Sequence, residues 1–214
     1  MKALLFTTLA VLLGTVPALA DGIVQGRVML DTARPPSVDA GYKPKTIKPI
    51  QAEESGRAIV WLEKSGLTYP QTRVGEVVKI QQSGYQFRPS VIAVQKGASA
   101  EFPNKDDEFH NVFSYSKIRR FDLGRFRKDE PSPRITFDKP GLVKIYCEIH
   151  QHMRCRVLVL ETPWFAVTDT EGQFKISGIP PGEYEIKALL PSEKRIESKV
   201  TVTQGKTTLV ELSR

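Results

Sequence analysis

The stretch VKIYCEIHQHMRCRVLVL, residues 143–160, decides the fold because it joins two strand patterns through a loop rich in potential metal donors. Residues 143–146 and 157–160 alternate as β-strands do, so Cys147, His150 and Met153 fall on the turn between them. One short loop can therefore bring three donor side chains to a single point. A fourth donor, His110 in the segment FHNVFS, must arrive from a different hairpin.

These four side chains form a chemically specific set. A soft thiolate, two imidazoles and a thioether are the donors of a trigonal His2Cys copper site with a weak axial Met, which is used for one-electron transfer. The sequence therefore predicts one type 1 copper ion per chain. Its candidate ligands are His110, Cys147, His150 and Met153.

Around these donors the chain resembles the cupredoxins, in particular the amicyanin and methylamine-utilisation type of plastocyanin-like protein. The resemblance rests on FRP (87–89), GASAEFPNKD (97–106), HNV (110–112) and the spacing from Tyr146-Cys147 through His150 to Met153-Arg154. It implies a Greek-key β-sandwich over residues 75–161 with the same four copper ligands. It also implies that Asn111 ties the two ligand segments together near the sulfur.

Two other interpretations of the same residues remain open. An exported chain with two cysteines would ordinarily pair them, here as Cys147 with Cys155. A zinc ion accepts Cys and His ligands, and His152 could complete such a site, although zinc prefers harder donors than the thioether of Met153. We otherwise expect His152 to be a solvated loop histidine.

The first twenty residues predict export. Lys2 precedes an apolar run that ends at Ala18-Leu19-Ala20, the pattern of a signal peptide cleaved after Ala20. No later apolar run is long enough to span a bilayer. We expect a protein without a membrane span, located in a bacterial periplasm.

The remaining sequence predicts an all-β protein, because period-two patterns recur between Gly and Pro turns and helical periodicity is almost absent. The predicted strands cover residues 24–30, 58–62, 77–81, 91–95, 98–102, 135–137, 174–176, 184–189, 199–202 and 207–212.

The segments on either side of the copper-binding block each hold too few strands to bury a core alone. Joined, residues 21–70 and 163–214 resemble the carboxypeptidase regulatory-like, transthyretin-type sandwich, with TD (168–169) and IPPG (179–182) among the matching positions. We therefore expect the cupredoxin domain to be inserted into a second β-sandwich. The alternative is a loose N-terminal arm followed by a separate C-terminal domain.

The chain carries a formal net charge of +7, and seven cations gather close to the ligand segment: Lys117, Arg119, Arg120, Arg125, Arg127, Lys128 and Arg134. Such a patch could steer an acidic redox partner, or it could be an ordinary solvated loop. Nucleic acid is not an expected partner after export.

The histidine count argues against an enzyme. Multicopper oxidases and copper nitrite reductases need further histidine-rich sites, whereas this chain has three histidines in all. Two functions remain. The first is periplasmic one-electron transfer with a redox protein such as a cytochrome or dehydrogenase, through the edge of His150. The second is copper storage, delivery or resistance.

Overall fold

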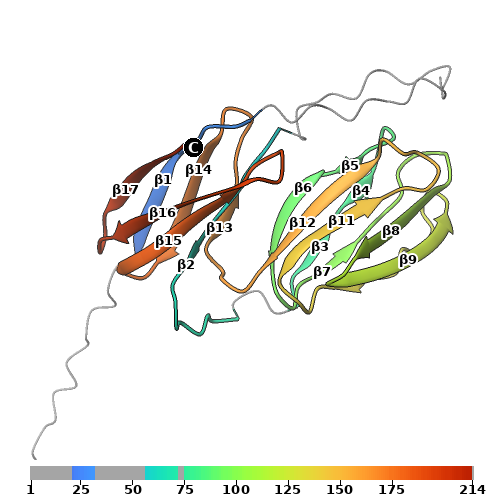
Figure 1. Ribbon diagram of the computed structural model, residues 1–214. Coiled ribbons are helices and arrows are strands. Elements are labelled where there is room, and N and C mark those ends of the chain that lie inside the picture. Colours follow the sequence, from blue (N-terminus) through green and yellow to red (C-terminus); the bar gives the residue numbers. More distant parts are fainter. Residues whose placement is uncertain (1–20, 32–55, 72–74, 214) are drawn as a thin grey trace, which may run out of the picture.

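The computed structural model describes residues 21–31, 56–71 and 75–213. These residues form strands, turns and bends without any helix, so the prediction of an all-β protein is confirmed. Figure 1 shows two β-sandwiches side by side. The predicted signal sequence, residues 1–20, lies outside the described residues. Within the described part of the chain, the structure holds no helix of a length and hydropathy that would cross a membrane.

The first sandwich is built from strands at both ends of the chain, and we call it the flanking sandwich. One sheet has the order β14 (Gln173–Ile179), β1 (Gly22–Val28), β17 (Thr207–Leu212), and the other has the order β13 (Phe165–Val167), β2 (Ile59–Glu63), β15 (Gly182–Leu189), β16 (Arg195–Val202). Strand β1 runs antiparallel to β14 and parallel to β17. Strand β2 lies between β13 and β15. Each sheet therefore contains strands from before and after residues 75–161.

Local sequence explains how the flanking sandwich closes. Strand β14 alternates buried and exposed residues, and its buried Phe174 and Ile176 join a core that includes Val24 and Val60. Gly26 permits a close approach between strands, because a Cβ at this position would collide with the backbone of Val210.

The second sandwich carries the donor residues, and we call it the site sandwich. Its larger sheet has the order β6 (Val91–Gln95), β12 (Arg154–Leu160), β11 (Gly141–Tyr146), β8 (His110–Ser116), β9 (Arg119–Phe126). Facing it are the sheet β10 (Ile135–Thr136), β7 (Ser99–Glu101), β3 (Val77–Lys79) and the ribbon β4 (Gln81–Gln82), β5 (Phe87–Arg88). The core between these layers includes Phe87, Phe102, Phe137 and Val143.

The hairpin of β8 and β9 is the main element missing from the sequence-predicted strands. Strand β9 exposes charged residues on one side, whereas Phe121 and Leu123 are only partly buried against the core on the other. Because Arg residues are frequent in this strand, the alternation of apolar and polar residues that marks a β-strand is weak in its sequence. Residues 119–126, which the sequence left open as a solvated loop, are a paired edge strand.

Strand β12 belongs to both packing regions. Cys155, Val157 and Val159 face the core of the site sandwich. Leu158 and Leu160 join a separate buried cluster with Ile59, Trp61 and Leu189 of the flanking sandwich. Because both faces are buried, residues 157–160 form a continuous apolar run.

Arg156 adds polar contacts between the same two bodies. Its guanidinium donates to the carbonyl oxygens of Leu190 at 3.2 Å, Pro191 at 2.9 Å and Arg57 at 3.4 Å. Strand β12, which begins where the donor loop ends, is thereby fixed to the flanking sandwich.

Candidate metal centre

Three of the four predicted ligands converge at one end of the site sandwich. His110 is the first residue of β8, and Cys147 and His150 lie in the loop between β11 and β12. The Cys147 Sγ atom is 3.9 Å from His110 Nδ1 and 3.8 Å from His150 Nδ1. One ligand atom from each residue lies within 4.8 Å of the other two, and all three residues are buried. This compact group can surround a single ion.

Met153 lies at the end of the same loop. Its side chain is 1% exposed and belongs to the apolar core that also contains Cys147. Its backbone N–H donates to the His150 carbonyl oxygen at 2.9 Å, which closes the loop into a turn. The structure therefore places the thioether residue in the same buried cluster as Cys147.

Asn111 joins the two segments that supply the donors. Its Oδ1 accepts a hydrogen bond from the Glu148 backbone N–H at 2.8 Å, and its Nδ2 donates to Asp122 Oδ1 at 2.9 Å. The bond to Glu148 is the link that the cupredoxin resemblance implied. Because Asn111 is 2% exposed, water competes little with these bonds.

The imidazole rings of His110 and His150 approach each other through their Nδ1 atoms. His110 Nδ1 and His150 Nδ1 are 3.0 Å apart. On the far side of its ring, His110 Nε2 donates to Asp106 Oδ2 at 2.9 Å. With both rings neutral, one shared proton can lie between the two Nδ1 atoms. A metal ion bound by both nitrogens would replace that proton.

The electrostatics favour the protonation states that bind metal. Burial alone would raise the pKa of the Cys147 thiol, but hydrogen bonds from His110 and nearby backbone N–H groups outweigh it and lower that pKa. Burial and the positive charge of His110 lower the pKa of His150 to about 4, so its imidazole is neutral near pH 7.

His110 behaves differently in the metal-free site. Burial alone would lower the pKa of His110, but the Cys147 sulfur and the Asp106 carboxylate outweigh it and raise that pKa. The contact between His110 and Cys147 therefore raises the pKa of the imidazole and lowers the pKa of the thiol.

Tyr85 and His152 cover the donor group. The Tyr85 ring contacts both donor histidines edge to face, with centroid separations of 5.9 Å to His110 and 5.1 Å to His150. His152 Nε2 donates to the Tyr85 carbonyl oxygen at 3.0 Å. His150 is 8% exposed, so its edge is more enclosed than we expected.

His152 differs from its sequence interpretation. The sequence predicted a solvated loop histidine, but the residue is partly buried and bonded to the turn that holds Tyr85. It lies outside the group formed by His110, Cys147 and His150. The signal missed from sequence was Tyr85, because nothing in its local pattern places an aromatic ring over the two histidines.

No disulfide joins Cys147 and Cys155, so the disulfide interpretation is not realised in this structure. Cys155 is 2% exposed, points into the site-sandwich core and contacts the Pro89 carbonyl oxygen at 3.6 Å. Its place on β12 is that of a small apolar residue.

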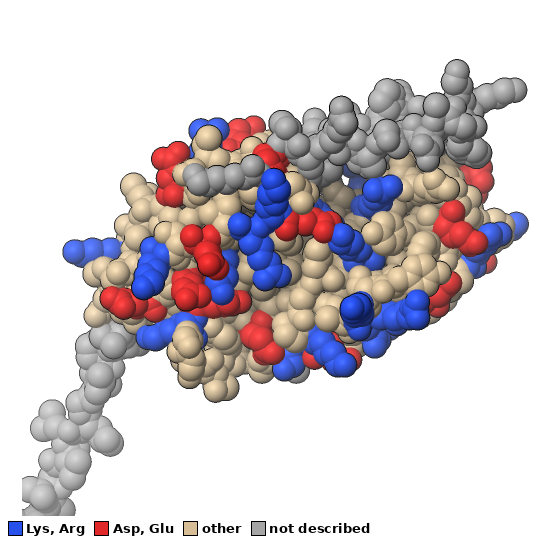
Figure 2. Space-filling view, viewed as in Figure 1, with Lys and Arg blue, Asp and Glu red and all other residues tan. Residues whose placement is uncertain are grey.

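The basic residues near the site are partly neutralised. Arg125 pairs with Glu148 at 3.2 Å, Lys128 with Asp107 at 3.0 Å, and Arg134 with Glu101 at 2.6 Å. Arg127 instead lies over the Phe109 ring at 4.4 Å. Figure 2 shows positive and negative side chains intermixed on the visible face.

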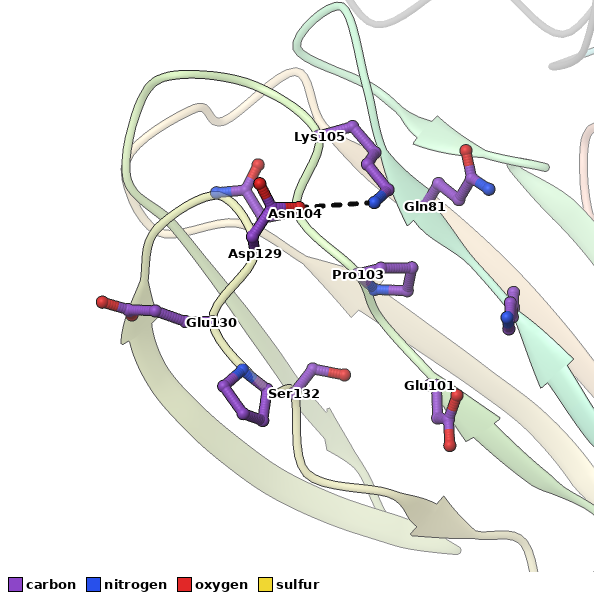
Figure 3. Close-up of a pocket in the computed structure, with 10 residues that line it drawn as sticks. Gln81, Glu101, Pro103, Asn104, Lys105, Asp129, Glu130 and Ser132 are labelled. Atoms are coloured by element: carbon purple, nitrogen blue, oxygen red, sulfur yellow. Dashed lines mark ion pairs between the residues drawn. The ribbon is translucent and has the colours of Figure 1, made fainter.

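A surface pocket of about 400 Å³ lies on the same sandwich, and Figure 3 shows its lining. Lys105 and Asp129 form an ion pair of 3.6 Å across it, with Glu101 and Glu130 nearby. The lining contains neither His nor Cys. This pocket is therefore separate from the donor group.

No family model and no curated protein matches the chain. Among solved structures, it is similar to a copper-containing nitrite reductase from Thermus scotoductus SA-01, with 29% identity and a TM-score of 0.37. The match covers 39% of this chain and spans only 22% of the nitrite reductase. Two Cu(I) forms of amicyanin variants also match, both with a TM-score of 0.37. One has 17% identity and covers 39% of this chain and 82% of the variant; the other has 16% identity and covers 47% and 98%.

Proposed function

We propose that this chain is an exported cupredoxin that binds one type 1 copper ion and transfers single electrons in the periplasm. The observation that carries the proposal is the buried group of His110, Cys147 and His150, whose donor atoms lie within 4.8 Å of one another. Met153 is proposed as the weak axial ligand, since it lies in the same buried cluster.

The donor set fits copper better than zinc. Two imidazole Nδ1 atoms and one thiolate suit either metal, but a thioether favours copper. His152, the residue that could have completed a zinc site, donates instead to the Tyr85 carbonyl oxygen. A bound copper ion would supply the one-electron Cu(II)/Cu(I) couple.

The surrounding residues fix the positions of the donor side chains and exclude water from them. Asn111 fixes the Cys147 loop to β8, and the Met153 backbone closes the turn around His150. The three donor residues are between 0% and 8% exposed. A rigid, water-poor site limits ligand movement when the ion changes charge, which suits electron transfer.

The proposed function is not enzymatic. The sequence has three histidines, of which His110 and His150 belong to the donor group and His152 holds the Tyr85 turn. No histidine is left to build the additional copper sites that oxidases and nitrite reductases use.

We also propose that the site sandwich, residues 75–161, is an insertion into the flanking sandwich. The pairing of β1 with β14 and β17, and of β2 with β13 and β15, supports this division. The redox partner is proposed to be a periplasmic cytochrome or dehydrogenase with an acidic surface. Export to the periplasm is supported by the signal-like pattern of residues 1–20.

Three measurements on the protein loaded with one equivalent of copper separate electron transfer from copper handling. An electron carrier should cycle reversibly on an electrode, exchange electrons rapidly with a c-type cytochrome, and release copper slowly to a chelator. Rapid transfer of copper to the chelator, with no electron exchange, would instead identify a copper storage or delivery protein.

A further inference from the structure

Asp106 contacts the donor residue His110 on the side of its ring away from Cys147. Its Oδ2 accepts a hydrogen bond from His110 Nε2 at 2.9 Å, and its side chain is 13% exposed. An ionised carboxylate can only accept hydrogen bonds. The proton of a neutral His110 ring is therefore held at Nε2, which leaves the Nδ1 lone pair directed toward Cys147 and His150.

The same carboxylate holds the turn that covers the site. Asp106 Oδ1 accepts from the Gly84 backbone N–H at 2.7 Å, and Oδ2 accepts from the Tyr85 backbone N–H at 3.0 Å. Tyr85 has a φ of 58°, a conformation that non-glycine residues rarely adopt. Its ring meets both donor histidines, so Asp106 acts on His150 through Tyr85 as well as on His110 directly.

Asp106 is itself held in place. Its backbone N–H donates to Asn104 Oδ1 at 2.9 Å, and Asn104 is 1% exposed. The Asn104 side-chain amide also donates to the carbonyl oxygens of Glu108 and Phe126. The carboxylate thus belongs to an ordered network rather than to a mobile surface side chain.

We propose that Asp106 is a positioning residue that presents His110 Nδ1 to the metal and, through its negative charge, favours Cu(II) over Cu(I). The inference rests on the proposed copper function. Partners that orient a ligating histidine change metal affinity by roughly 10- to 100-fold when they are removed. A nearby negative charge also stabilises the more highly charged oxidation state.

The neighbouring residue provides a matched control. Asp107 has a side chain that is 90% exposed and pairs with Lys128. Asp106→Asn and Asp107→Asn remove the same charge one residue apart, but only the first touches His110. Copper affinity, measured by competition with a chelator, should fall roughly 10- to 100-fold in Asp106→Asn and stay near wild type in Asp107→Asn. The reduction potential should rise more in Asp106→Asn than in Asp107→Asn.

A measurement on the metal-free protein tests the proposal independently of copper. Nitrogen NMR of the His110 ring, at a pH where the ring is neutral, should show the proton on Nε2 in wild type and in Asp107→Asn. The proposal is overturned if wild type carries the proton on Nδ1, or if the two variants match in copper affinity and potential. If wild type shows the Nε2 proton but binds no copper, the positioning role stands and the proposed electron-transfer function fails.

Discussion

The two sandwiches are built alike but differ in what their cores contain. The core of the flanking sandwich is made of apolar and aromatic side chains. The core of the site sandwich continues into Cys147, Met153 and Cys155, and at that end it meets the buried polar residues His110, Asn111 and His150. All three histidines and both cysteines of the chain belong to the site sandwich. The difference teaches that the candidate donor residues are confined to one end of one sandwich, whereas the other sandwich contacts it through strand β12.

Deleting the site sandwich is the most drastic way to test this division. Replacing residues 75–162 by a short flexible linker should abolish copper binding and still leave a cooperatively unfolding β-protein, since the core strands of the flanking sandwich all remain. Its stability should fall because Ile59, Trp61 and Leu189 lose their apolar cover. Circular dichroism during thermal unfolding checks this, and a disordered product would contradict the insertion.

Removing the polar link between the sandwiches should have the next largest effect. Arg156→Ala leaves the carbonyl oxygens of Leu190, Pro191 and Arg57 without this donor, which should lower the free energy of unfolding by about 3 kcal/mol. Arg154→Ala, at an exposed position on the same strand, should change it little. Denaturant unfolding measures both variants. Equal stabilities would mean that the two bodies are not held together through Arg156.

The pH dependence of stability gives a further test of the difference between the two sandwiches, because the donor residues that titrate all lie in the site sandwich. His150 has a folded-state pKa of about 4, below its ordinary value of 6.5, so the unfolded chain binds a proton more readily between these values. Its contribution to stability is complete above pH 6.5 and is lost as pH falls toward 4. The raised pKa of His110 acts with the opposite sign: its contribution is complete below pH 6.5 and is lost as pH rises through the raised value.

The expected result is that metal-free His150→Gln loses less stability than wild type between pH 6.5 and 4. Denaturant unfolding across this range measures the difference, and NMR titration of the His150 ring gives the pKa directly. Parallel pH profiles for the two proteins would show that His150 does not titrate as the enclosed site requires.

Sequence and structure agree best where chemistry constrains the chain. The Cys147 to Met153 spacing and the flanking strand patterns predicted one loop between β11 and β12, and the structure has that loop. By contrast, β9 was not predicted because Arg residues interrupt its pattern. The contacts of Asp106 and Tyr85 with the histidines could not be predicted, since they depend on how the turn after β4 folds over a distant loop.

The smallest expected effect concerns Arg125 and Lys128, two exposed cations of the site sandwich. Reversing Arg125 and Lys128 to Glu should slow association with an acidic redox partner, and the difference should shrink as salt rises. The effect should be modest, because both cations already pair with carboxylates. Stopped-flow kinetics at low and high salt provide the measurement. Rates equal to wild type at both salts would leave these residues without a role in steering.

The central claim is tested most directly by the visible absorption spectrum after Cu(II) is added to the reduced metal-free protein. Cys147 lies beside both histidine Nδ1 atoms, whereas Cys155 points into the apolar core. Wild type and Cys155→Ser should therefore show an intense thiolate-to-copper band at one copper per chain, and Cys147→Ser should lack it. A band that persists in Cys147→Ser and disappears in Cys155→Ser would contradict the assigned copper site.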